Sequence, residues 1–103
     1  MNITINKKQS DQGVVVKVAG EIDAFTAPQL REELAALADG NSKTIIVDLQ
    51  DVTYLDSTGL GVFVGLFKQM KSNGGEMRLT NLSDRLQRLF EITGLSHVMQ
   101  MKG

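Results

Sequence analysis

TIIVDLQDVTYLDSTGLG, residues 44–61, carries the change from a strand to a helix on which the fold depends. The β-branched run at residues 44–49 predicts a strand that is buried on both faces, as strands inside parallel sheets are. Residues 51–56 are predicted to turn into a helix that runs from about Ser57 to Ser72, with Asp56 as its N-cap. The stretch therefore predicts one central strand and the helix that follows it.

The rest of the chain predicts further strands and helices in alternation. Strands are predicted near residues 3–5, 14–18 and 76–80, helices near residues 26–39 and 83–93, and a last short strand or turn at residues 97–101. The order β-β-α-β-α-β-α implies a mixed, mostly parallel sheet of four to five strands flanked by helices. At this length the chain fits one compact domain, so we expect a single α/β domain over residues 1–103.

The first helix carries the clearest start signal. Thr26-Ala-Pro-Gln29 has the form of a capping box, in which the threonine oxygen accepts a backbone N–H and the glutamine reaches back. Phe25 and Leu30 stand at the positions of a hydrophobic staple, and Gly40 is predicted to end the helix in a left-handed conformation.

Composition excludes several classes of site and partner. Cysteine is absent and His97 is the only histidine, so we expect no disulfide, no metal site and no cofactor. The N-terminus does not resemble a signal peptide and no apolar run is long enough for a membrane span, which predicts a cytoplasmic protein. The net charge is −1 and basic residues form no run, which argues against nucleic acid. We therefore expect a protein partner, and a monomer when the chain is free.

The charges are unevenly placed along the chain. Residues 20–56 hold eight acidic residues against two basic ones, whereas residues 57–103 hold six basic residues against three acidic ones. Scattered solvated side chains account for such a pattern better than a designed patch does. Ser57 nevertheless comes directly after the acidic segment.

The helix predicted at residues 57–72 has two apolar faces. The first, predicted to anchor the helix to the sheet, comprises Leu60, Phe63, Val64, Phe67 and Met70. The second comprises Gly59, Gly61, Val62, Gly65, Leu66 and Gln69. A glycine inside a helix lowers the stability of the helix by about 1 kcal/mol relative to alanine. Three glycines therefore imply that another part of the fold or a partner approaches the helix closely. The spacing leaves open whether another element of the same fold or a partner covers the second face.

Ser57 lacks the surroundings of a catalytic nucleophile. His97 lies far along the chain, and no G-x-S-x-G elbow surrounds the serine, which argues against a hydrolase. A receiver domain that accepts phosphate on Asp48 is also unsupported, because the acidic pair and the lysine that such a domain needs have no counterparts. We therefore expect no enzymatic activity, and helix capping and regulatory modification remain for Ser57.

Residues 51–65 resemble the phosphoacceptor motif of the STAS domain of anti-sigma factor antagonists. The resemblance continues at residues 81–95, NLSDRLQRLFEITGL, and returns to Gly20-Glu-Ile-Asp23 and Ala27-Pro28. It covers essentially the whole chain. It implies that Ser57 is phosphorylated by an anti-sigma factor that is itself a serine kinase. It also implies that the unphosphorylated form binds this kinase and frees the sigma factor, and that a PP2C-type phosphatase restores this form.

The resemblance and the helical pattern together predict a partner-binding surface that includes the phosphoacceptor. Its expected residues are Asp23, Asp56, Ser57, Thr58, Gly59, Gly61, Val62, Gly65 and Leu66. No phosphorylation of Thr58 is implied. The alternative is a STAS module of another assembly, such as a stressosome-like scaffold or a transporter subunit, and a pull-down with an anti-sigma kinase and ATP distinguishes the two.

Overall fold

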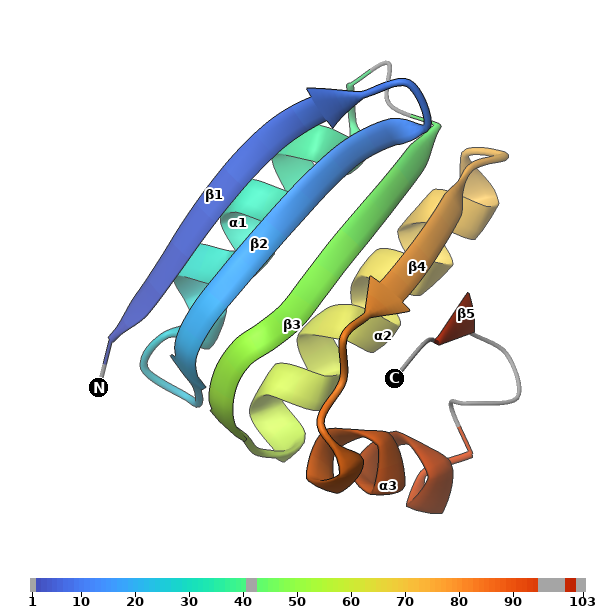
Figure 1. Ribbon diagram of the computed structural model, residues 1–103. Coiled ribbons are helices and arrows are strands. Elements are labelled where there is room, and N and C mark those ends of the chain that lie inside the picture. Colours follow the sequence, from blue (N-terminus) through green and yellow to red (C-terminus); the bar gives the residue numbers. More distant parts are fainter. Residues whose placement is uncertain (1, 41–42, 95–99, 102–103) are drawn as a thin grey trace.

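The computed structural model describes residues 2–40, 43–94 and 100–101, which form a five-stranded sheet and three helices (Figure 1). Across the sheet the strands follow their order in the chain: β1 (Ile3–Ser10), β2 (Gly13–Ile22), β3 (Thr44–Leu55), β4 (Glu76–Thr80) and β5 (Gln100–Met101). β1 and β2 are antiparallel and the other neighbours are parallel. The predicted α/β class and mostly parallel sheet are confirmed, whereas His97 lies outside the described residues.

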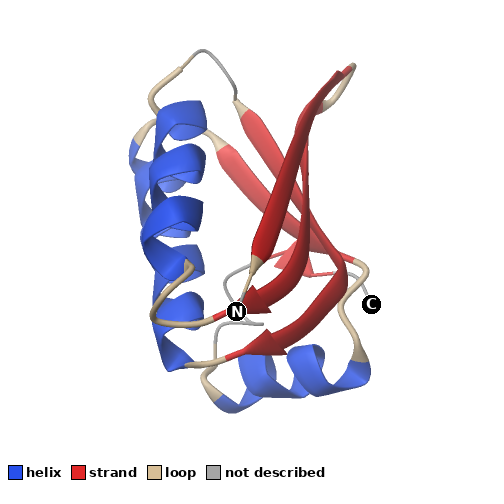
Figure 2. Ribbon diagram, turned by 90° about the vertical axis from the view of Figure 1, so that its left-hand side faces the viewer, coloured by secondary structure: helices blue, strands red, loops and turns tan. Residues whose placement is uncertain are grey.

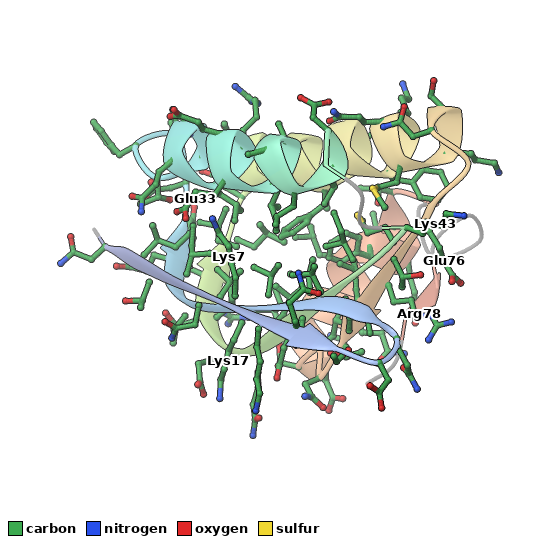
Figure 3. The ribbon with its side chains drawn as sticks, turned by 90° about the horizontal axis from the view of Figure 1, so that it is seen from above. Lys7, Lys17, Glu33, Lys43, Glu76 and Arg78 are labelled. Atoms are coloured by element: carbon green, nitrogen blue, oxygen red, sulfur yellow. The ribbon has the colours of Figure 1, made fainter. Side chains whose placement is uncertain are left out.

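The helices are α1 (Ala27–Ala38), α2 (Ser57–Ser72) and α3 (Asp84–Ile92). α1 and α2 lie side by side on one face of the sheet, and α3 lies across the sheet's end (Figure 2). In Figure 3, Lys7 points from β1 toward Glu33 on α1, with 3.0 Å between Nζ and Oε1, whereas Lys17 points away from the helices. No helix in the described part of the chain covers the second face of the sheet.

The prediction that residues 44–49 are buried on both faces is therefore wrong. Ile45, Val47 and Leu49 are buried beneath the helices, whereas Ile46 and Asp48, on the opposite face, are only half-buried. The alternation arises because α1 and α2, which follow β2 and β3, pack on the same side of the sheet.

β3 is longer than the sequence predicts, because residues 51–55 continue the strand instead of turning. They pair with the end of β2, from Ala19 opposite Asp51 to Ile22 opposite Leu55, with one register shift just before this segment and one within it. Such irregularities bend a strand and increase its twist. As a result the first turn of α2 lies beside the end of β2, where the Asp56 N–H donates to the Ile22 carbonyl at 3.3 Å.

One core joins the three helices to the sheet. Phe63 of α2 and Phe90 of α3 are fully buried, with ring centroids 6.2 Å apart. Both rings lie in the same buried cluster as the inward-facing side chains of β2, β3 and β4, such as Val16, Val47 and Leu79. The start of α2 is thus fixed between the sheet, α1 and α3.

Candidate functional site

The site begins at the first turn of α2, where Asp56 is the N-cap, as predicted. Its backbone is extended, and its Oδ1 accepts the N–H of Thr58 at 3.0 Å and of Gly59 at 3.1 Å. The bounds of α2, Ser57–Ser72, also match the prediction. Ser57 is the first residue of the helix, and its side chain and that of Thr58 are exposed.

The electrostatics of this turn are set by the Asp56 carboxylate. The unsatisfied N–H groups of a helix N-terminus carry partial positive charge and attract anions. Here the carboxylate already accepts from two of these groups. An anion attached to Ser57 therefore meets a helix end whose positive charge is largely compensated, with a negative side chain as its neighbour in the chain.

Asp23, a predicted contact residue, is buried in the turn that joins β2 to α1. Asp23 is only 5% exposed, and its Oδ1 accepts the N–H of Phe25 at 2.9 Å and of Thr26 at 3.0 Å. Burial raises the pKa of the Asp23 carboxyl, but hydrogen bonds from Thr26 and Phe25 outweigh it, so the pKa lies below its ordinary value of 3.8. Because Asp23 faces inward, it holds the turn and does not offer a contact surface.

The same turn corrects the predicted capping box. The Thr26 hydroxyl donates to the Glu21 carbonyl at 2.8 Å and accepts the Asp23 N–H at 2.9 Å, and it makes no side-chain cap to α1. Phe25 is 87% exposed, so the staple with Leu30 is absent, and Gly40 does not adopt the predicted left-handed conformation. Asp23, three residues before Thr26, accepts the Thr26 N–H, and Phe25 between them lies in solvent.

Gly59 is required by internal packing. A Cβ at this position would lie 2.5 Å from Ile22 Cγ2 and 2.5 Å from Leu55 Cδ1, closer than carbon atoms approach in proteins. Only glycine lets the first turn of α2 lie this close to the ends of β2 and β3. Its place in the phosphoacceptor motif thus has a structural reason.

Val62 and Leu66 correct a second expectation. They are 3% and 4% exposed, and α2 packs against α1 along this side of the helix. The open question about the second apolar face is thus answered for these two residues by internal packing. They were predicted as partner contacts, but packing inside the fold covers almost all of their surface, and what remains exposed lies in the groove described below.

Gly61 and Gly65 have the opposite environment. Both are exposed, and a Cβ at either position would have no neighbour within 4 Å. Ser57, Gly61 and Gly65 are spaced by four residues, so they lie along one exposed face of α2. Internal packing gives no reason for either glycine.

A groove of about 230 Å³ runs between α1 and α2 beside this face. Gly61 and Gly65 form one wall, Arg31 and Ala35 form the other, and Val62, Leu66 and Gln69 complete the lining. No sequence pattern points to Arg31 or Ala35, because this wall exists only once α1 lies next to α2. We define the exposed α2 face, Ser57, Thr58, Gly61 and Gly65, together with this groove as the α2 surface.

The described part of the chain offers little else to chemistry. Within residues 2–40, 43–94 and 100–101, no group of three His, Asp or Glu side chains is arranged to hold a metal ion. In the same ranges no helix has the length and apolarity to cross a membrane. The geometry of the site is thus an exposed hydroxyl at a capped helix start, one turn before the groove between α1 and α2.

Comparison with known proteins places this arrangement in a family. Residues 4–103 match the STAS domain, and the chain belongs to the STAS domain family. It is 52% identical over 101 residues to the anti-sigma-B factor antagonist of Bacillus subtilis, covering 98% of this chain and 92% of that protein. It is 50% identical over 103 residues to the anti-sigma-B factor antagonist of Listeria monocytogenes, covering 99% and 90%.

A solved structure agrees with this placement. The crystal structure of an anti-sigma factor antagonist from Mycobacterium paratuberculosis superimposes with a TM-score of 0.89 at 27% identity, covering 98% of this chain and 86% of that one. The predicted resemblance to STAS-domain anti-sigma factor antagonists is confirmed.

Proposed function

We propose that this protein is an anti-sigma factor antagonist that works as a protein-binding switch without catalytic activity. In its unphosphorylated form it binds an anti-sigma serine kinase in the cytoplasm and thereby frees a sigma factor. Relatives about half identical over nearly their full length carry the name of anti-sigma-B factor antagonist, which supports this assignment.

Phosphorylation of Ser57 ends this binding in our proposal. The observation that carries it is the exposure of Ser57 at the first position of α2, directly after the capping carboxylate of Asp56. A phosphoserine brings a charge of about −1.5 to −2 at neutral pH. The Asp56 carboxylate already accepts two N–H groups at the start of α2. When the partner binds, the phosphate charge therefore loses water or meets partner groups at the interface. A hundredfold loss of affinity needs only about 2.7 kcal/mol.

The partner's contact area is the α2 surface. Ser57, Thr58, Gly61 and Gly65 are exposed there, and the two glycines let a partner's backbone approach the helix closely. The buried residues of the predicted set support this surface, because they fix the turn and the helix in place. They are Asp23, Gly59, Val62 and Leu66. Sequence reasoning grouped these two sets together, and burial separates them.

A PP2C-type phosphatase returns the protein to its binding form. A phosphatase has to reach the phosphate ester from solvent, and the exposure of the Ser57 side chain supports this step. No other residue of the chain is needed for the hydrolysis, since the phosphatase supplies its own chemistry. The free protein is a monomer in this scheme.

Intact-mass spectrometry after incubation with the cognate anti-sigma kinase and ATP tests the proposal. We expect one phosphate per chain, located at Ser57, and none on the Ser57→Ala variant. Thr58→Ala is the matched control, because Thr58 is the neighbouring exposed hydroxyl, and it should still accept the phosphate. A kinase that neither binds nor modifies the protein would point to a STAS module of a different assembly.

A further inference from the structure

A second groove lies on the other side of the phosphoacceptor, between the end of β3 and α3. Its volume is about 460 Å³, and Val52, Leu55 and Leu86 form its apolar floor. Tyr54 and Ile92 stand at its rim, 43% and 77% exposed. They are two of the three large hydrophobic side chains exposed in the described part of the chain, so exposed apolar surface gathers at this groove.

The groove is built from fixed parts. The Ser83 hydroxyl accepts the Leu86 N–H at 3.2 Å at the start of α3, and Phe90 anchors the same helix on Phe63. On the other side, Leu55 lines the groove and directly precedes Asp56 and Ser57 in the chain, so the groove reaches to within two residues of the phosphoacceptor. A site that needs no rearrangement binds with a smaller entropic cost.

The charges at this groove are mainly positive. Arg85 and Arg88 are exposed on α3 and both line it, together with the carboxylate of Asp84. Among the described residues neither arginine forms an ion pair. An arginine presents a planar set of donors that matches a carboxylate in a two-bond geometry. The groove thus combines an apolar floor with cations that suit an acidic group.

We infer that this groove receives an apolar side chain of the anti-sigma kinase, next to an acidic residue that pairs with Arg85 or Arg88. The inference rests on the proposed function and extends the contact area from the α2 surface to α3. Apolar anchors in fixed pockets beside arginine are the usual centres of binding energy in protein interfaces.

The open rim favours a protein segment over a small molecule. Pockets for small molecules bury about 70–90% of their ligand, and walls as exposed as Tyr54 and Ile92 do not enclose one in that way. A partner protein brings the missing cover with it. A second copy of this chain is the remaining candidate for the groove. A molecular mass in solution that rises with protein concentration would distinguish such a dimer from binding of the kinase.

Titration calorimetry with the purified kinase, using the full chain, tests the inference. We expect Ile92→Asp to bind at least about tenfold more weakly and Ile92→Lys to lose less, because only the aspartate repels an acidic partner group. The double variant Arg85→Glu with Arg88→Glu should also lose at least about tenfold. Lys8→Glu, one charge reversal of the same sign on exposed β1 and half the change of the double variant, is the control and should bind like the parent.

Two readouts separate this inference from its alternatives. Thermal unfolding should leave every variant within about 3 °C of the parent, because the changed side chains are exposed. Parent-like affinity in Ile92→Asp and in the double arginine variant overturns the inference alone, provided that the parent binds and Ser57→Asp binds more weakly. A parent that fails to bind the kinase overturns the proposed function as well. A dimer that these variants abolish, with kinase binding intact, assigns the groove to a second copy and overturns the inference.

Discussion

Asp56 and Ser57 are neighbours in the chain with opposite relations to the helix that they begin. Asp56 turns its carboxylate to the backbone N–H groups of Thr58 and Gly59, whereas Ser57 leaves its hydroxyl in solvent. Capping is thus done by Asp56, and the Ser57 hydroxyl is left free for the phosphorylation that we propose. This division explains why a change at Ser57 need not disturb the start of α2.

Replacement of the cap measures its contribution. Asp56→Ala loses both hydrogen bonds, and we expect a loss of about 1 kcal/mol in the free energy of unfolding. For a domain of this size that lowers Tm by about 4–8 °C. Asp56→Asn keeps an acceptor oxygen and should lose less. Thermal unfolding followed by circular dichroism measures all three proteins, and equal Tm values for parent and Asp56→Ala would contradict the role of the cap.

Asp23 makes stability depend on acid pH. Because its pKa is lower in the folded protein than in the unfolded chain, its ionisation stabilises the fold above the ordinary value of 3.8. This contribution is lost as the pH falls through the folded pKa. Asp23→Asn has no such ionisation, so its Tm should fall less steeply than that of the parent between about pH 5 and about pH 3. Parallel Tm curves over this range would contradict the depressed pKa.

On the scale of elements, α2 carries glycines of two kinds. Gly59 is buried against Ile22 and Leu55, whereas Gly61 and Gly65 face open space. We expect Gly61→Ala and Gly65→Ala each to stabilise the free domain by about 0.5–1 kcal/mol, because alanine favours the helix and meets nothing. Both should weaken kinase binding, because the added methyl group keeps the partner's backbone away.

For Gly61→Ala and Gly65→Ala we therefore expect a higher free energy of unfolding together with weaker binding to the kinase. Chemical denaturation gives the free energy of unfolding, and titration with the kinase gives the affinity. Gly59→Ala is the control for internal packing and should cost about 1–3 kcal/mol through overpacking. If Gly61→Ala and Gly65→Ala leave affinity unchanged, the partner does not approach this face of α2.

On the scale of the whole molecule, local signals predicted the elements well. The N-cap at Asp56 and the bounds of α2 depend on neighbouring residues, and the sequence predicted them correctly. The motif around Ser57 belongs to this class too, because it lies within one strand end and one helix turn.

The local signals at the start of α1 failed because Asp23 and Thr26 bond within the turn before the helix, whereas other mispredicted features depend on contacts between distant segments. Residues 51–55 form a strand because β2 is there to pair with them, and Val62 is buried because α1 packs against α2. Ile46 is half-buried because no described helix covers that face. The hydrophobic pattern of a sequence indicates which residues are buried, but the arrangement of the elements determines what buries each of them.

That arrangement also determines how a charge at Ser57 acts on the molecule. The side chain is exposed, and the turn beneath it is held by Asp56, by Gly59 against β2 and β3, and by the rest of α2 in the core. An acidic residue in the first turn of a helix is favourable by itself, which offsets repulsion from Asp56. We therefore expect Ser57→Asp to shift Tm by no more than about 3 °C.

Binding should respond differently to the same change. Ser57→Asp places a fixed negative charge in the contact area, and we expect at least about tenfold weaker binding to the kinase, with Ser57→Ala close to the parent. Calorimetry and thermal unfolding on the three proteins measure both effects. A large fall in Tm for Ser57→Asp would show that charge acts through the scaffold, and unchanged affinity would remove Ser57 from the contact area. Weaker binding on an unchanged fold is the result that a switch confined to the surface requires.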